Sequence, residues 1–243
     1  MARTVPAACE RAVSSSRRLR EARGRRYLDR SVKAASVRAM TRRLTARGQE
    51  RRRQLLDYAT EQFAARGYHP TSVAEIVTGL GVGKGVFYWY FSSKEELFLE
   101  ILRHAQRDLR RAQQNAIAGV DDPLERIRRG IRASLQWSAA HRDYYTLVQF
   151  ALTEERFAPA LRRGQETAAR DVTRHVREAI DIGVVRDADP EVVAHGILGI
   201  TTHLARVFIH ERGRPPDEVA DAAVTFVMEG VLTADATLSG PTG

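Results

Sequence analysis

The segment from Ser72 to Phe91, SVAEIVTGLGVGKGVFYWYF, constrains the fold more than any other part of the chain. Ser72 and Glu75 fit the S-x-x-E capping box, which predicts a helix that begins at Val73. Aliphatic residues follow at helical spacing, and Gly81 stands where a helix-ending residue is expected. The segment therefore predicts a short amphipathic helix that ends in a turn.

A second short helix is expected after this turn, from about residue 83 or 84 to Tyr90. Phe87 and Phe91 are four residues apart, which suits its buried face. The sequence SKEE at residues 93–96 is a second capping box and opens a longer helix. Two short helices joined by a glycine-bearing turn, with a capped helix after them, are the layout of a helix-turn-helix DNA-binding motif.

The residues of this motif suit contact with a duplex. Lys84 would begin the second helix, and in such docking the first residues of that helix reach base edges. Gly83 and Gly85 carry no side chain, so the backbone could approach a groove closely. Tyr88 and Tyr90 offer hydroxyl donors to phosphate oxygens. Periodicity alone leaves a second interpretation open, in which the motif is ordinary helical packing and its aromatic residues belong to the core.

The sequences LGVGKGVFYWYFSSKEEL and LLDYATEQFAARGYHPTSVAEIV resemble the signature of the tetracycline-repressor (TetR) family of bacterial transcriptional regulators. The resemblance covers roughly Gln49 to Asp108. It implies that three N-terminal helices bind DNA as half of a homodimer. It also implies DNA contacts at Thr71, Ser72, Gly83, Lys84, Gly85, Tyr88, Trp89, Tyr90 and Lys94.

Two positions depart from the pattern of this family. Many relatives carry histidine where this chain has Tyr90, and serine or threonine is frequent where it has Gly83. Both changes alter the groups available for phosphate and base contacts. The operator sequence therefore cannot be carried over from relatives.

The chain has 243 residues and is 43% hydrophobic, which allows one large domain or two modest ones. Its apolar runs are shorter than the roughly 18 to 20 residues that cross a membrane, so no membrane partner is expected. The arginine-rich start lacks the apolar core of a secretory signal. Cys9 is the only cysteine, which excludes a disulfide within one chain and a cysteine-based metal site. A cytoplasmic, nucleoid-associated protein is expected.

The formal net charge of +9 is distributed unevenly. Residues 1–39 hold 11 Lys and Arg against 3 Asp and Glu, and residues 40–53 hold 6 against 1. Residues 54–243 hold 22 against 26, so the body of the chain is slightly acidic. The positive charge lies N-terminal to the predicted motif, where it could contact phosphates.

Residues 1–39 are expected to form a basic, disordered extension. Such an arm could follow phosphates, but a complete family N-terminus could equally begin at Met40, MTRRLTARGQ. Residues 1–39 would then come from a misassigned start, which the intact mass of the protein from its native gene would test. The arginines of the following segment are expected to contact phosphate under either start, Arg51 among them; they are Arg42, Arg43, Arg47, Arg51, Arg52 and Arg53.

Helical signals continue throughout the chain, and an all-α fold of about nine helices is expected. No strand-like alternation and no fixed-period repeat is found. The expected domains are residues 40–109 for DNA binding and 110–233 for effector binding and dimerisation, followed by a loose tail at 234–243. The expected helices are 51–65, 73–80, 84–90, 95–118, one that opens at Asp122-Pro123, 141–152, 158–182, 190 to about 213, and 216–232.

The C-terminal half is expected to supply a dimer interface and an effector pocket. By the family resemblance, the last two helices form a four-helix bundle with those of a second chain. Small residues would allow close helix approach there; they are Gly196, Gly199, Ala205, Ala222, Ala223 and Gly230. A pocket for an unknown small molecule is expected among the middle helices. Its candidate residues are Trp137, Tyr144, Tyr145, Phe150, Phe157, His175, His203 and Arg206.

No catalytic motif or cofactor signature is present, so an enzyme is not expected. The chain lacks a phosphate-binding P-loop, a zinc-protease H-E-x-x-H and a hydrolase G-x-S-x-G, and its histidines form no recognisable metal set. The sequence favours a homodimeric repressor that a small-molecule effector releases from a pseudo-palindromic operator. Two other classes remain open: a basic architectural protein that binds DNA without sequence preference, and a small-molecule-binding or enzymatic helical domain.

Overall fold

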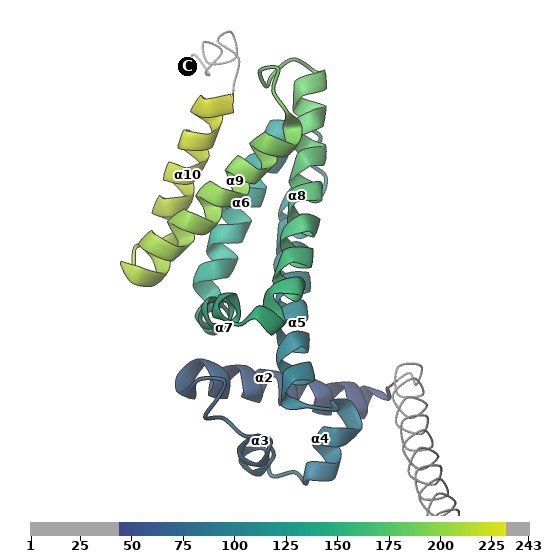
Figure 1. The fold of residues 1–243 in the computed structure, drawn as a ribbon. Helices are drawn as coiled ribbons and strands as arrows, with labels where there is room; N and C mark the ends of the chain where they lie inside the picture. The colour runs from purple at the N-terminus through teal and green to yellow at the C-terminus, as the bar shows by residue number, and fades with distance from the viewer. Residues whose placement is uncertain (1–43, 232–243) are drawn as a thin grey trace, which may run out of the picture. The chain divides into compact units, whose positions relative to one another are not determined.

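The computed structural model describes residues 44–231, and their regular elements are helices (Figure 1). The expectations about residues 1–39, Cys9, Arg42, Arg43 and the tail at 234–243 lie outside this range. Nine α-helices, a 3₁₀ turn and one π-helix follow one another in these residues, as the sequence predicts for an all-α chain. They are α2 (Ala46–Arg66), α3 (Val73–Gly79), α4 (Lys84–Tyr90), α5 (Lys94–Ile117), α6 (Pro123–Ala140), α7 (Arg142–Thr153), η1 (Glu155–Phe157), α8 (Ala158–Asp181), α9 (Pro190–Leu204), η2 (Ala205–Glu211) and α10 (Pro216–Val231).

The chain divides into two compact units, residues 1–53 and residues 54–243. The division falls within α2, and each unit is described by itself. The expected boundary between residues 109 and 110 lies inside α5, so separate DNA-binding and effector domains remain a prediction.

Capping residues fix several helix starts as the sequence predicts. Asp122 and Asp189 each precede a proline, and each carboxylate accepts a hydrogen bond from a first-turn amide at 2.9 Å. The proline that follows lacks an amide hydrogen, but this removes no hydrogen bond, since a first-turn amide has no partner within the helix. Gly81 adopts a φ of +64° in the turn after α3, a conformation that disfavours side chains with a Cβ.

Two hydrophobic cores hold residues 54–231 together. The first surrounds Phe63, Phe98 and Phe157, and it joins α3 and α4 to α5, α7 and the start of α8. The second surrounds Leu135, Val176 and Ala223, and it joins α6 and α8 to α9, η2 and α10. Helix α5 packs on both α6 and α8, and in Figure 1 it runs from the end of α4 up beside them. A single helix therefore connects the predicted DNA-binding motif with the C-terminal helices.

Most observed bounds lie within one residue of the expected ones, and two differences are more substantial. Helix α2 begins at Ala46, five residues before the expected Arg51. The helix that starts at Pro190 changes from α to π geometry at Ala205. The sequence did not predict this change, because apolar periodicity does not reveal the wider turn of a π-helix.

The continuous helix of α9 and η2, Pro190–Glu211, is long and apolar enough to cross a membrane by length and composition, with a mean hydropathy of 1.5. It packs against α8 and α10 of the same chain and carries several histidines and charged residues. A core helix of a soluble protein passes the same test, so these features are weak evidence for a membrane span.

Candidate nucleic-acid interface

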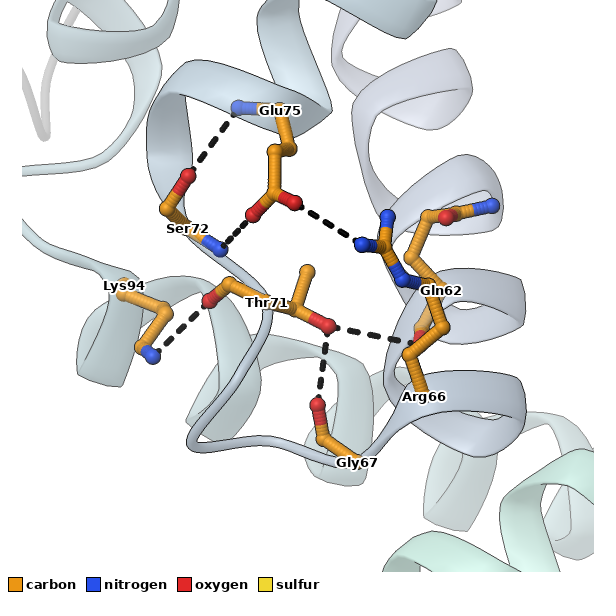
Figure 2. Close-up of polar contacts among 7 residues, drawn as sticks. All are labelled: Gln62, Arg66, Gly67, Thr71, Ser72, Glu75 and Lys94. Carbon is orange, nitrogen blue, oxygen red and sulfur yellow. Dashed lines mark hydrogen bonds and ion pairs between the residues drawn. The ribbon is translucent and has the colours of Figure 1, made fainter.

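Helix α3 begins with the predicted capping box, shown in Figure 2. The Ser72 amide donates to Glu75 Oε2 at 2.7 Å, and the Glu75 amide donates to Ser72 Oγ at 3.2 Å. The Arg66 guanidinium of α2 donates to Glu75 Oε1 at 2.9 Å. The hydrogen bonds from Ser72, with a smaller contribution from Arg66, hold the pKa of Glu75 below its ordinary value. The ion pair ties α3 to α2 at the start of the motif.

Helix α4 separates a buried face from an exposed one, as its sequence predicts. Phe87 and Phe91 are buried in the first core. Tyr88 and Trp89 remain 56% and 52% exposed, which is unusual for aromatic side chains of this size. Lys84 opens the helix and is also exposed. We call the exposed residues of α4 and its N-cap the α4 face; it consists of Gly83, Lys84, Gly85, Tyr88 and Trp89.

Three further predicted contacts differ in their exposure. Ser72 is exposed at the start of α3, and Tyr90 is half-buried with its ring 4.5 Å from that of Trp89. Arg51 is partly exposed on α2 and lies in the unit of residues 1–53. Arg51 therefore stays a contact predicted from the sequence alone.

The structure gives Thr71 a different role from the DNA contact that the resemblance implies. The residue is fully buried. Its hydroxyl donates to the carbonyl oxygens of Gly67 at 2.8 Å and Gln62 at 3.4 Å (Figure 2). These bonds close the connection between α2 and α3, and the buried side chain has no path to a duplex in this conformation.

Lys94 also has an internal role. Its ammonium donates to the carbonyl oxygens of Tyr68 at 2.8 Å, Thr71 at 2.9 Å and His69 at 3.4 Å. Figure 2 shows the bond to Thr71. It also lies 4.3 Å from the centre of the Tyr68 ring. Burial, with a smaller effect of Arg156, lowers the pKa of Lys94. Lysine has three N–H donors, and all three have acceptors here. Lys94 thus fastens the α2–α3 connection to the first turn of α5.

Tyr68 is the centre of an aromatic cluster that the sequence reading missed. Its ring stacks on Phe150 of α7 at 5.2 Å and meets Phe98 of α5 and Phe157 of η1 edge-on. The adjacent His69 pairs with Glu154 through Nε2 and Oε1 at 2.9 Å. These contacts join residues far apart in sequence, so local periodicity could not reveal them. The cluster links the connection before α3 to α7 and η1.

A cavity of about 80 Å³ lies between α5, α6, α8 and α9. Aliphatic side chains line much of it, including Ile117, Ile127, Ile131, Val172 and Ile197. Its polar residues are mostly paired: Arg110 with Asp171 at 2.7 Å, and Arg126 with Glu178, which lies beyond the lining, at 2.7 Å.

His175 is the one predicted effector residue that lines this cavity. Its Nδ1 atom is buried and accepts or donates no hydrogen bond, since the nearest carboxylate oxygen, on Glu178, is 3.8 Å away. Burial is the main cause that lowers the pKa of His175, followed by the nearby charge of Arg174. A buried polar atom without a partner, in the wall of a cavity, is a natural contact for a ligand.

The other predicted pocket residues lie elsewhere. Phe150 and Phe157 pack around Tyr68. His203 is exposed, and Arg206 pairs with Glu211 at 2.7 Å near the surface. Their aromatic or cationic side chains could have lined a pocket as well as a core or a surface. The helix faces that they occupy place them in the first core or at the surface instead.

The remaining aromatic candidates sit at the end of α6 and on α7. Trp137 stacks on His141 at 4.1 Å and donates to Asp108 at 2.9 Å. Burial raises the pKa of Tyr144 to about 12. Tyr145 stacks flat on a histidine that the sequence reading did not select, His210 of η2, at 3.8 Å.

His210 is buried within the second half of the chain. Its Nε2 shares a hydrogen bond with Ser138 Oγ at 2.8 Å, and its Nδ1 has no partner. The Arg142 guanidinium donates to its carbonyl oxygen at 3.0 Å. Burial, assisted by the charge of Arg142, lowers the pKa of His210. Among residues 44–231, no group of three histidine, cysteine or acidic side chains could hold a metal ion.

Comparison with known families gives two matches. Residues 55–101 match the family described as "Bacterial regulatory proteins, tetR family", and residues 120–231 match "Tetracyclin repressor-like, C-terminal domain". The first match contains the capping box and the α4 face. The second contains η2, α10 and the cavity residues of α6, α8 and α9.

Individual relatives agree with these matches over most of the chain. The HTH-type transcriptional regulator YdgC of Bacillus subtilis is 25% identical over 78% of this chain and 96% of its own length. The HTH-type transcriptional activator FasR of Mycolicibacterium smegmatis is 28% identical over 75% of this chain and 83% of its own.

A similar fold occurs in a solved structure from Saccharomonospora viridis. That protein, a transcriptional regulator in complex with choline, has a TM-score of 0.67 and is 23% identical. The alignment covers 76% of this chain and 99% of that chain. The likeness is one of fold, and it extends over the motif and the C-terminal helices together.

Proposed function

Because the chain belongs to the tetR family of bacterial transcriptional regulators, we propose that it is a homodimeric repressor that a small-molecule effector releases from its operator. DNA binding through a helix-turn-helix is the property of the family. The observation that carries the proposal for this chain is the α4 face, where exposed Lys84, Tyr88 and Trp89 stand on a helix whose other side is locked into the core.

The α4 face suits a major groove because its chemistry is mixed. Lys84 can donate to base acceptors or phosphate, and Tyr88 can donate to phosphate. The Trp89 ring supplies apolar contact to thymine methyl groups or sugars. Gly83 and Gly85 have open space around their Cα atoms, so nothing of the protein prevents close approach there. Ser72, Tyr90 and Arg51 complete the proposed contacts, and Thr71 and Lys94 support them from within.

The proposed dimer uses the outward faces of α9 and α10. Val192 and Phe226 are 66% and 64% exposed there. A Cβ added at Gly196, Gly199 or Gly230 would meet nothing within this chain. A second copy would cover this apolar face and explain why so hydrophobic a helix as α9 is largely exposed. Of the small residues predicted at the interface, Ala205 and Ala223 are buried within the chain, whereas Ala222 faces outward.

The proposed effector site is the cavity between α5, α6, α8 and α9. Its volume of about 80 Å³ is smaller than the roughly 300 Å³ of a typical small ligand site, so a ligand must part these helices to enter. The choline bound by the Saccharomonospora protein supports small-molecule binding in this fold. His175 would supply a polar contact in a largely aliphatic site.

Helix α5 would transmit the effect of ligand to the motif. Its last turns line the cavity through Gln113, Gln114 and Ile117, and its first turn holds Lys94 against the α2–α3 connection. The helix has 24 residues and is about 36 Å long, so a small tilt at the cavity displaces its other end. A ligand that favours the parted helices would thereby favour a state with altered α4 spacing in the dimer.

Selection of genomic fragments by the full chain at physiological salt, with excess random competitor DNA, tests this function. The proposal predicts enrichment of one pseudo-palindromic site, because two α4 helices related by twofold symmetry read two half-sites. Broad retention without enrichment would instead support a protein that binds DNA without sequence preference. A reporter gene placed behind the enriched site then distinguishes repression from activation.

The oligomeric state is tested separately by light scattering of purified variants. Phe226→Glu should shift the chain from dimer to monomer, because it places a charge in the proposed interface. Leu152→Glu is the matched control, since Leu152 is 59% exposed on α7 and should leave the dimer intact. A wild-type monomer, or a dimer that survives Phe226→Glu, would contradict the proposed interface.

A further inference from the structure

A second hollow, of about 420 Å³, lies on the outer side of α8 and α9. Helix α8 contributes Arg170, Arg174 and Arg177, whose spacings of four and three residues place them on one helix face. His195 of α9 lies on the opposite side. Two glutamates, one on each helix, also line the hollow; they are Glu166 and Glu191. We call this hollow the arginine groove.

The three arginines of this groove differ from most arginines of the neighbouring helices α5 and α6, which form ion pairs with carboxylates. All three are exposed, and none forms an ion pair with a carboxylate in the part of the chain that the structure describes. Arg170 donates only to the Thr167 hydroxyl, at 3.2 Å. By contrast, Arg110 and Arg126 each have a carboxylate partner at 2.7 Å. The groove thus offers guanidinium groups, which suit phosphate oxygens, with donors that remain available.

Arg174 also lines the inner cavity, so the two hollows meet at this residue. On one side lie the unpaired arginines, and on the other lie aliphatic residues such as Ile127, Val172 and Ile197. The positive charge of Arg174 also acts on a residue of the inner cavity, since it contributes to the lowered pKa of His175. A ligand that extends past Arg174 would meet a cationic surface at one end and an apolar one at the other.

We propose that the arginine groove binds the phosphate-bearing head of an amphipathic effector whose apolar part occupies the inner cavity. This inference rests on the proposed effector site and names its ligand class. The groove, at about 420 Å³, has room for more than one phosphate group, whereas the cavity admits only a narrow apolar group unless α5 and α8 separate. A cation such as choline does not suit the groove, because three guanidinium groups would repel it.

Calorimetric titration of the full chain with decyl phosphate, below its micelle concentration, tests the inference without DNA. Decanol and pyrophosphate serve as tail-only and head-only probes, and both should bind more weakly. Replacing Arg170, Arg174 and Arg177 together by glutamine should weaken decyl phosphate binding at least about tenfold, since charge-assisted hydrogen bonds are lost. Arg162→Gln with Arg163→Gln is the matched control, because these exposed arginines of α8 lie outside both hollows.

Several outcomes separate the inference from the proposed function. Unchanged decyl phosphate affinity in the triple variant would overturn the inference. A changed oligomeric state of the triple variant would also overturn it, because the groove would then be a contact between copies of the chain. Binding to vesicles that contain phosphatidic acid, with no binding of free decyl phosphate, would overturn the cavity part and assign the groove to a lipid surface. Gly130→Leu, which fills the cavity, should weaken decyl phosphate but not pyrophosphate. Decyl phosphate binding that leaves operator DNA bound would uphold the inference while contradicting the proposed release.

Discussion

Two lysines ten residues apart show how one motif separates support from contact. Lys84 is exposed at the start of α4, whereas the Lys94 ammonium is held by three carbonyl oxygens beneath the α2–α3 connection. Sequence resemblance assigns both to DNA. The structure distinguishes them because a long flexible side chain at a helix start can turn either outward or back toward the preceding loop.

Replacement of each lysine by alanine is predicted to have opposite effects on stability and binding. Lys94→Ala should lower the free energy of unfolding by about 1–2 kcal/mol, since it removes charge-assisted hydrogen bonds to partly buried carbonyl groups. Lys84→Ala should leave stability within about 0.5 kcal/mol and weaken operator binding. Urea unfolding and a DNA-binding titration measure the two quantities. A stable Lys94→Ala protein would show that the three hydrogen bonds contribute little.

The buried His210 and the partly buried His175 predict an acid-sensitive fold. Burial lowers the pKa of both rings from the ordinary value of 6.5. Below pH 6.5 the unfolded chain therefore binds protons that the folded chain does not, and stability should fall as the pH decreases toward the folded pKa. A histidine whose acid dissociation constant is tenfold larger in the folded chain than in the unfolded one lowers the free energy of unfolding by about 1.4 kcal/mol once the pH is below both pKa values.

The variant His210→Gln isolates this effect. Glutamine can still form a hydrogen bond with Ser138 but does not titrate, while Tyr145 and Arg142 stay in place around it. Urea unfolding at pH 7.5, 6.0 and 5.0 should show a smaller loss of stability in the variant than in the wild type. Equal losses would mean that His210 is protonated as readily in the folded chain as in the unfolded one.

At the scale of the helix, glycines decide how closely elements approach. A Cβ at Gly79, the last residue of α3, would overlap the Tyr58 ring of α2, whereas a Cβ at Gly130 of α6 would meet nothing. Tyr58 packs against the first core, so its ring cannot turn away without losing contacts. The close approach of α3 to α2 at Gly79 therefore fixes the angle at which α4 is presented.

Gly79→Ala and Gly130→Ala should consequently shift stability in opposite directions. Overpacking at Gly79 should lower the free energy of unfolding by about 1–3 kcal/mol and weaken operator binding. Gly130→Ala should raise the free energy of unfolding by about 0.5–1 kcal/mol, because alanine restricts the unfolded chain and favours the helix. Thermal unfolding of both variants measures the contrast, and a stabilised Gly79→Ala protein would contradict the packing argument.

The sequence predicted elements far better than the contacts between them. The Ser72–Glu75 capping box, the Asp-Pro starts and the Phe87–Phe91 face are local patterns, and the structure confirms them. The second predicted box forms only in part, because Ser93 Oγ accepts from the Glu96 amide while the Glu96 carboxylate bonds to Ser92 instead. The aromatic residues expected in a pocket instead pack around Tyr68 or stack on histidines, because which face of α7 turns inward depends on distant partners. The π-helical turn that buries His210 left no periodic signal.

Across the whole molecule, the proposed effector and DNA sites are coupled through α5. Linkage requires that ligand and operator weaken each other's binding by the same factor. For a typical coupling free energy of about 1–3 kcal/mol, this factor is about 5 to 150. The bonds of Lys94 and the His69–Glu154 pair are the contacts that a displaced α5 or α7 would strain first.

His69→Ala should reduce this coupling without changing the α4 face. The substitution removes the hydrogen bond between His69 and Glu154, which precedes η1, while Lys84 and Tyr88 keep their exposure. The ratio of operator affinities with and without saturating ligand should therefore move toward one. Pro70→Ala is the neighbouring control, since Pro70 is exposed and makes no side-chain hydrogen bond. An unchanged ratio in His69→Ala would exclude this pair from the coupling.

The most direct test of the central claim compares two affinities of the full chain at physiological salt, one for its selected site and one for a scrambled duplex of equal length. The account predicts discrimination of at least about 10³-fold in the wild type. It also predicts that Lys84→Ala combined with Tyr88→Ala loses most of this discrimination while the dimer mass and unfolding temperature are unchanged. Equal affinity for both duplexes, or full discrimination by the double variant, would contradict the assignment of sequence recognition to the α4 face.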